Sequence, residues 1–200
     1  ACEVGADALL VVTPYYNKTT QAGLVKMYQA IADASTKPLI LYNVPSRTGI
    51  NIDVSTYEAL ADHPNIKAIK EANGNISLIV AAAAAVGDKL DIYSGNDDQI
   101  IPIMSVGGIG VISVLSNVAP KETIEMCRKY LEGDTQGAAR MQLDMLPLCN
   151  ALFCETNPIP VKAAMAAKGF CENYVRLPLV PMSEDKEAKM LEIMKEMGVL

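Results

Sequence analysis

The sequence predicts an α/β fold: the last five strand–helix units of a (β/α)8 TIM barrel, followed by a C-terminal helical domain. Two observations lead to this prediction. Short apolar runs bounded by Gly, Pro and Asn alternate with stretches of helical periodicity as far as Gly133, and beyond it the pattern is helical only. Such runs are typical of buried parallel strands, and their alternation with helices favours a parallel sheet with right-handed crossovers.

Each element follows from its local pattern, in chain order. The expected strands are residues 8–12, 38–42, 66–70, 90–93 and 110–114. The expected helices between and after them are residues 20–34, 54–61, 76–86, 97–104 and 121–131, and those of the tail are 135–146, 160–167 and 183–197. Leu24, Tyr28 and Ile31 share one face of the first helix, and Asp53 stands at an N-cap position. Prolines punctuate the tail around residues 157–160 and 178–181.

Five units do not close an eight-stranded barrel, which typically takes about 250 residues. Because the sequence starts with Ala1 just before a strand, we expect roughly three N-terminal units to be absent from it. A natural half-barrel or an open doubly wound sheet is the alternative. The expected domains are residues 1–133, the C-terminal portion of the barrel, and residues 134–200, the helical domain.

Composition excludes several functional classes. The 200 residues are 50% hydrophobic with a formal net charge of −6, which gives no basic patch for nucleic acid. The longest apolar stretch, around residues 76–86, is too short to span a bilayer. The five cysteines form no CxxC pair and His63 is the only histidine, so we expect reduced cysteines, no metal site and a cytoplasmic protein.

Reactive side chains stand where two neighbouring strands give way to loops. Tyr42 ends one apolar run and is followed by Arg47, and Lys70 ends the next run. In a barrel of this kind the carboxyl ends of the strands carry the chemistry. A lysine there among apolar neighbours has a lowered pKa, which suits it to form an imine with a carbonyl substrate. The adjacent Asp97 and Asp98 are explained by a helix N-terminus rather than by a metal.

Several motifs, in their order and spacing, resemble the dihydrodipicolinate synthase (4-hydroxy-tetrahydrodipicolinate synthase) family over essentially the whole sequence. They are residues 13–17 (TPYYN), 41–49 (LYNVPSRTG), 69–75 (IKEANGN), 94–98 (SGNDD), 110–113 (GVIS) and 157–162 (NPIPVK). The resemblance implies a (β/α)8 barrel with a C-terminal helical domain, assembled as a homotetramer (a dimer of dimers). It also implies a lyase of lysine and diaminopimelate biosynthesis, which condenses pyruvate with L-aspartate 4-semialdehyde.

The resemblance also implies roles for single residues. Lys70 matches the imine-forming lysine, so no metal or organic cofactor is expected beyond this covalent lysine–pyruvate imine. Tyr42 matches the tyrosine that moves protons at the imine, and Arg47 matches the arginine that engages a substrate carboxylate. Tyr16 matches a proton-relay tyrosine lent across the dimer interface. Gly95 and Ile112 match positions whose backbones line the pyruvate pocket of the family. Tyr15 matches a tyrosine that stacks against its counterpart at the dimer interface.

One departure from the family pattern leaves alternatives open. The family's relay also uses a threonine of a Gly-Thr-Thr-Gly-Glu motif, which does not occur here. An inactive barrel fragment is therefore one alternative. A related pyruvate-dependent lyase acting on N-acetylneuraminate or a keto-deoxy sugar acid is another, although such enzymes usually lack an arginine at the position of Arg47.

Overall fold

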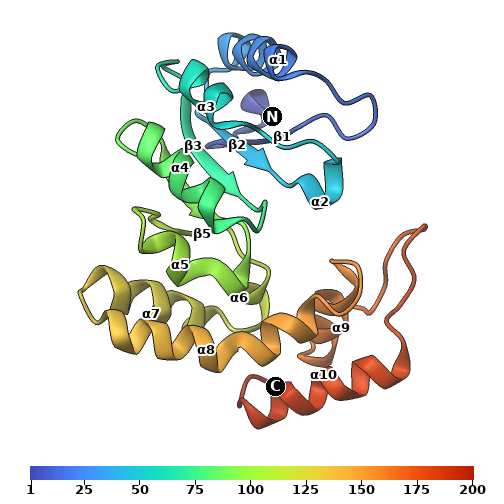
Figure 1. Ribbon diagram of the computed structural model, residues 1–200. Coiled ribbons are helices and arrows are strands. Elements are labelled where there is room, and N and C mark those ends of the chain that lie inside the picture. The colour runs from blue at the N-terminus through green and yellow to red at the C-terminus, as the bar shows by residue number, and fades with distance from the viewer. The chain divides into compact units, whose positions relative to one another are not determined.

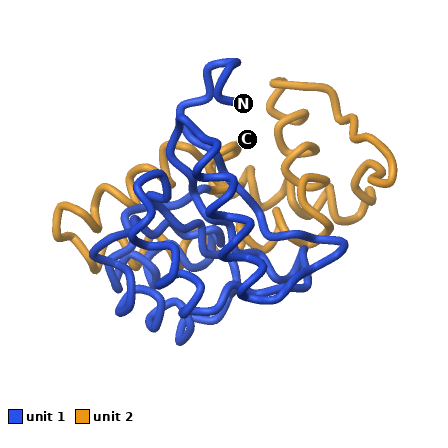
Figure 2. The backbone as a smooth tube through the Cα atoms, turned by 90° about the horizontal axis from the view of Figure 1, so that it is seen from above, with its two compact units in different colours: residues 1–112 blue, residues 113–200 orange.

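The computed structural model describes all 200 residues and consists of two compact units, unit 1 (Ala1–Ile112) and unit 2 (Ser113–Leu200), shown in Figure 2. The expected domain boundary after residue 133 falls inside unit 2, between two helices, and the division into domains stays a prediction.

Unit 1 is built on a sheet of five parallel strands whose order in space is their order in the chain (Figure 1). The strands are β1 (Leu9–Val12), β2 (Leu39–Asn43), β3 (Ile66–Glu71), β4 (Asp91–Ser94) and β5 (Gly110–Val111). The helices are η1 (Cys2–Val4), α1 (Gln21–Ala34), α2 (Pro45–Thr48), α3 (Val54–Leu60), α4 (Ile76–Val86), η2 (Asp97–Gln99) and α5 (Ile100–Met104). The predicted five parallel strands are thus confirmed.

The core of unit 1 lies between the sheet and its helices. Leu39 and Leu41 of β2 and Ile69 of β3 pack in one apolar cluster with Tyr28 of α1 and Tyr57 of α3, all fully or almost fully buried. Along β2 burial alternates residue by residue, as expected of a strand with helices on one face only. Alternation therefore directs the intervening side chains to the opposite face of the sheet.

Some local predictions for unit 1 need correction. The strand expected at residues 110–114 is only Gly110–Val111. Asp53 occupies the N-cap position of α3, but its side chain makes no capping hydrogen bond there. The one-turn helix α2, which begins with Pro45 and carries Arg47, was not expected. Its first residue has the φ that proline fixes, which suits the start of a helix.

Unit 2 contains helices only. They are α6 (Leu115–Val118), α7 (Pro120–Leu131), α8 (Thr135–Leu152), α9 (Ile159–Ala167) and α10 (Glu184–Glu196). Helix α8 continues past Pro147, where the sequence predicted an end at Leu146. Pro147 is exposed, whereas Leu148 and Leu152 are fully buried, so packing of the following turn outweighs the missing hydrogen bond. None of the helices has the length and apolar character needed to cross a bilayer.

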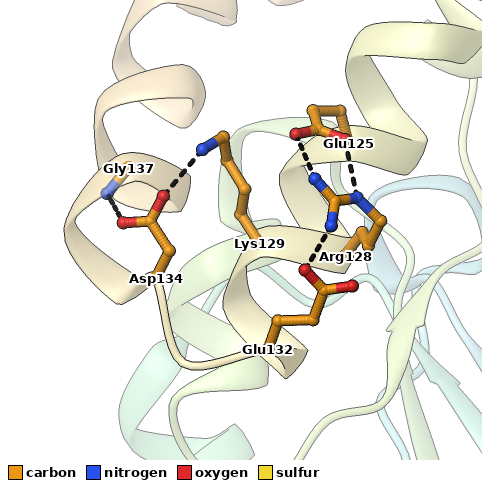
Figure 3. A network of polar contacts seen from close by, with 6 residues as sticks. All are labelled: Glu125, Arg128, Lys129, Glu132, Asp134 and Gly137. Carbon is orange, nitrogen blue, oxygen red and sulfur yellow. Dashed lines mark hydrogen bonds and ion pairs between the residues drawn. The ribbon is translucent and has the colours of Figure 1, made fainter.

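A polar network surrounds the turn between α7 and α8 (Figure 3). Asp134 caps α8 by accepting a hydrogen bond from the Gly137 N–H at 2.9 Å, and it also binds Lys129 of α7 at 2.7 Å. Arg128 of α7 binds both Glu125 and Glu132. A cap and a cation at the helix C-terminus both favour a chain reversal at this point.

Candidate active site

The candidate site lies at the carboxyl ends of the parallel strands of unit 1. Tyr42 of β2, Lys70 of β3 and Tyr93 of β4 are aligned across the three neighbouring strands. The amine nitrogen of Lys70 lies 4.3 Å from the centroid of the Tyr42 ring. Both side chains are half-buried, on the face of the sheet opposite to the apolar cluster. The structure thus brings together the two residues to which the sequence assigns the central chemistry.

Burial sets the protonation of both groups. It lowers the pKa of the Lys70 amine, and the nearby carboxylate of Asp97 opposes this effect. Burial raises the pKa of the Tyr42 hydroxyl, and the positive charge of Arg47 opposes it. Near neutral pH the site therefore holds more unprotonated amine than an exposed lysine would supply, beside a phenol that keeps its proton.

Asp97 is a residue of the site that the sequence explained otherwise. Asp97 and Asp98 open the one-turn helix η2, as expected, and Asp97, which is only 2% exposed, also acts on the charge of Lys70. Its carboxylate favours a positive charge on the Lys70 nitrogen, whether that nitrogen belongs to an ammonium or to an iminium group. The burial of one aspartate of the Asp97–Asp98 pair could not be read from two adjacent carboxylates.

Gly95 shapes the space beside the amine. Its backbone N–H donates a hydrogen bond to the Glu71 carbonyl oxygen at 2.7 Å. A Cβ at this position would lie 2.6 Å from the Ala72 Cβ and 3.2 Å from the Lys70 Cε. Only a residue without a side chain fits there, so the structure places the predicted Gly95 directly against Lys70.

Two other predicted residues lie further along the same edge. Arg47 stands on α2, one turn after β2, is exposed, and acts electrostatically on Tyr42. Ile112 follows β5, and its N–H donates to the Ser94 carbonyl at 2.9 Å. Both belong to the edge of the sheet that carries Lys70, and their contacts with substrate stay a prediction.

Tyr15 and Tyr16 lie apart from the amine. They follow β1 in an exposed bend, where the exposed fractions are 74% for Tyr15 and 91% for Tyr16. Both rings thus face solvent in this chain. Their predicted roles, at an interface and in a relay across it, require a second subunit and stay predictions.

A buried polar layer lies directly behind the site, and no sequence pattern predicted a role for its central residue, Glu71. The Glu71 carboxylate accepts hydrogen bonds from the Tyr57 hydroxyl at 2.8 Å, the Asn43 amide at 2.9 Å and the Asn73 N–H at 3.2 Å. Burial raises the pKa of Glu71 to about 7 despite these bonds. Strand alternation could have indicated its position, because the residue after Lys70 must face the helices.

No group of three or more His, Cys, Asp or Glu side chains is placed to hold a metal ion.

This geometry suits carbonyl chemistry by an amine. A nucleophilic nitrogen lies near a neutral hydroxyl that can donate a proton and a carboxylate, and a glycine without a side chain packs against the same lysine. Together they can form and stabilise an imine with a small keto compound.

Comparisons with known proteins point to one family. Residues 1–197 match the sequence model of the Dihydrodipicolinate synthetase family. The 4-hydroxy-tetrahydrodipicolinate synthase of Clostridium novyi is 52% identical over 192 residues, which are 96% of this chain and 64% of that protein. The chain thus spans slightly less than two thirds of that curated relative.

Solved structures give the same result. A crystal structure of dihydrodipicolinate synthase from Thermotoga maritima superposes with a TM-score of 0.97 at 44% identity, covering 99% of this chain and 68% of that one. The chloride-inhibited enzyme from Acinetobacter baumannii, complexed with pyruvate, superposes with a TM-score of 0.96 at 43% identity. The superposed region is 100% of this chain and 68% of the Acinetobacter baumannii chain. The predicted fold class, part of a (β/α)8 barrel with a helical C-terminal region, is confirmed by these structures.

Proposed function

The chain belongs to the dihydrodipicolinate synthetase family, and we propose that it provides the imine-forming site of a 4-hydroxy-tetrahydrodipicolinate synthase. In this reaction Lys70 forms an imine with pyruvate, and the derived enamine attacks L-aspartate 4-semialdehyde. The observation that carries the proposal is the half-buried Lys70 amine, 4.3 Å from the Tyr42 ring at the carboxyl ends of the strands. The proposed reaction belongs to lysine and diaminopimelate biosynthesis, and its proposed location is the cytoplasm.

The first half of the reaction uses the lowered pKa of the Lys70 amine and the raised pKa of the Tyr42 hydroxyl. The neutral amine of Lys70 adds to the keto carbon of pyruvate, and the former carbonyl oxygen takes up one of the two protons of the amine. The Tyr42 hydroxyl, which stays protonated because burial raises its pKa, donates the second proton as this oxygen leaves as water. The result is a protonated imine on Lys70 and a Tyr42 phenolate, which is the base for the next step.

The second half uses the iminium group as an electron sink. Its positive charge, which Asp97 favours, acidifies the methyl group, and transfer of one methyl proton to the Tyr42 phenolate gives the enamine. The enamine carbon then forms a bond to the aldehyde carbon of the second substrate, and the aldehyde oxygen takes up the proton of the Tyr42 hydroxyl. The amino group of that substrate finally displaces the Lys70 nitrogen from the imine carbon, which releases the product, restores the neutral amine and returns one proton to Tyr42. Lys70 itself supplies the carbonyl chemistry, so the proposed reaction uses no metal and no organic cofactor.

The remaining predicted residues orient the substrates. Arg47, exposed beside Tyr42, has the planar geometry to bind the carboxylate of L-aspartate 4-semialdehyde. A second substrate that carries a carboxylate is therefore favoured over the uncharged sugar aldehyde from which a sugar acid would be formed. Gly95 and Ile112 present backbone to the pyruvate. The exposed Tyr15 and Tyr16 fit a homotetramer in which Tyr16 completes the relay of a neighbouring subunit and Tyr15 stacks at the interface.

Reductive trapping tests the proposal. Full-length protein treated with pyruvate and sodium borohydride should carry the reduced pyruvate adduct on Lys70, as seen by mass spectrometry of peptides. The Lys70→Ala variant should lose the adduct and nearly all turnover. Lys67, exposed on the same strand, gives a matched control, because Lys67→Ala should keep both. An adduct on Lys67, or none on folded wild-type protein, would refute the proposal.

A further inference from the structure

The buried polar layer behind the site is built around one carboxylate. We call Asn43, Asn51, Tyr57, Glu71 and Asn73 the Glu71 network. Besides the three bonds to Glu71 described above, the Asn43 amide also donates to the Asn51 side-chain oxygen at 2.8 Å. Glu71 is 1% exposed and Asn43 is fully buried. The network therefore joins the ends of β2 and β3 to helix α3, with Asn43, Tyr57 and Glu71 buried and Asn51 and Asn73 partly buried.

Two members of the network are direct chain neighbours of the reacting residues. Asn43 follows Tyr42 on β2, and Glu71 follows Lys70 on β3, and the two pairs are aligned in the same register. On one face of the sheet the amine lies over the phenol ring, and on the other face the carboxylate binds the amide. The two contacts are one residue apart along the same two strands.

Backbone hydrogen bonds of the same residues extend this connection to the end of β4. The Glu71 carbonyl accepts the hydrogen bond from Gly95 N–H, and the Asn43 carbonyl accepts one from Ala72 N–H at 2.9 Å. A displacement of Glu71 would therefore shift the Lys70 backbone and the glycine that leaves room for its amine together.

We propose that Glu71 is a positioning residue of the lysine site: by binding Asn43 and Tyr57 on the helix side, its side chain fixes the β3 end that carries Lys70 relative to the β2 end that carries Tyr42. This inference rests on the proposed function of Lys70. Lysine reaches its substrate through a flexible side chain, so the position of its backbone and of the facing ring decides how often amine and hydroxyl are aligned. A displacement of about 1 Å can cost a reaction roughly a hundredfold in rate.

The choice of substituents separates positioning from bulk packing. In Glu71→Gln, the side-chain oxygen can accept from Asn43 and Asn73 while the amide nitrogen donates to the Tyr57 oxygen, so the network can be kept. Glu71→Ala removes it entirely. Tyr57→Phe removes a single hydrogen bond at nearly constant volume. Glu58, exposed on α3 next to Tyr57, provides a control in Glu58→Ala.

The test measures the rate of pyruvate trapping by sodium cyanoborohydride at increasing pyruvate concentrations in the full-length protein, together with the melting temperature. We expect Glu71→Ala to lower the rate at saturating pyruvate by about tenfold or more, with a smaller change in the half-saturating concentration. Tyr57→Phe should lower it by about threefold, because one of the contacts is lost. Glu71→Gln should restore the rate to within about threefold of wild type, because its bonds can be remade. Glu58→Ala should match the wild type.

Three outcomes would overturn the inference. The first is folded Glu71→Ala that traps pyruvate at the wild-type rate, whatever its melting temperature. The second is Glu71→Gln as impaired as Glu71→Ala, because the hydrogen bonds would then not be what matters. The third is a Tyr57→Phe variant that traps pyruvate at the wild-type rate. This outcome decides the question even if Glu71→Ala does not fold. Absence of trapping in the wild type itself would refute the proposed function, and the positioning role with it.

Discussion

The buried carboxyl of Glu71 should make unit 1 less stable as the pH rises, and Glu71→Gln should remove this dependence. Burial raises the pKa of Glu71 from its ordinary value of 4.5 to about 7. Between these two values the unfolded chain has released a proton that the folded chain still holds. The free energy of unfolding therefore falls as the pH rises through this range, and the fall is complete above about pH 7.

The size of the effect follows from the two pKa values. The interval from 4.5 to about 7 corresponds to about 3 kcal/mol in the free energy of unfolding, at about 1.4 kcal/mol for each pH unit. Glutamine carries no titrating proton and can keep the hydrogen bonds of the network. The stability of Glu71→Gln relative to wild type should therefore increase by about 3 kcal/mol from pH 4.5 to pH 8.

Denaturant unfolding followed by circular dichroism at a series of pH values between about 4.5 and 8 measures this difference. The comparison between the two proteins cancels the titration of all other groups. Glu58→Gln, which removes an exposed carboxylate on the same helix as Tyr57, is the matched control for the substitution itself. If the Glu71→Gln curve runs parallel to wild type, then Glu71 is ionised in the folded protein over the whole range, and the reasoning from burial is wrong.

Two further substitutions test the packing of each unit. Gly95→Ala would place a methyl group 2.6 Å from the Ala72 Cβ and 3.2 Å from the Lys70 Cε. It should therefore cost about 1–3 kcal/mol of stability and abolish pyruvate trapping. A Gly95→Ala variant that traps pyruvate normally would exclude close packing at this position. Met126→Ala removes a fully buried side chain from α7 and should cost about 2–5 kcal/mol in thermal or denaturant unfolding. Arg128→Ala, at an exposed position two residues further on, should change stability far less, so equal losses would contradict the burial of Met126.

Much of the fold follows from local patterns in the sequence. Helix α4 occupies the residues expected from its alanine-rich run, with Asn75 as its N-cap accepting from the Leu78 N–H. Thr20 likewise caps α1. Short apolar runs ending in Tyr42 and Lys70 gave the strands, because alternation and length are set by residues within each run. Local patterns were enough wherever the deciding interactions are local.

The predictions failed where distant packing decides. The sequence predicts a helix end at Leu146, yet the buried residues after Pro147 keep α8 intact. Glu71 illustrates the same limit in the candidate site. The sequence shows it only as the charged neighbour of Lys70, and its partner Tyr57 comes from a helix that precedes β3 in the chain. No spacing rule predicts which phenol meets which carboxylate across a sheet and a helix.

The parallel register explains why the candidate chemistry and the buried layer cannot vary independently. Neighbouring residues on a strand face opposite sides, so Lys70 and Glu71 are fixed by one backbone, as are Tyr42 and Asn43. A slip of β2 against β3 by one residue would direct Asn43 toward the amine and remove it from the carboxylate at the same time. The contact between Asn43 and Glu71 therefore disfavours any register that separates the Lys70 amine from the Tyr42 ring. Burying a titratable carboxyl destabilises the fold above neutral pH, but the same carboxyl selects the strand alignment that the lysine site needs.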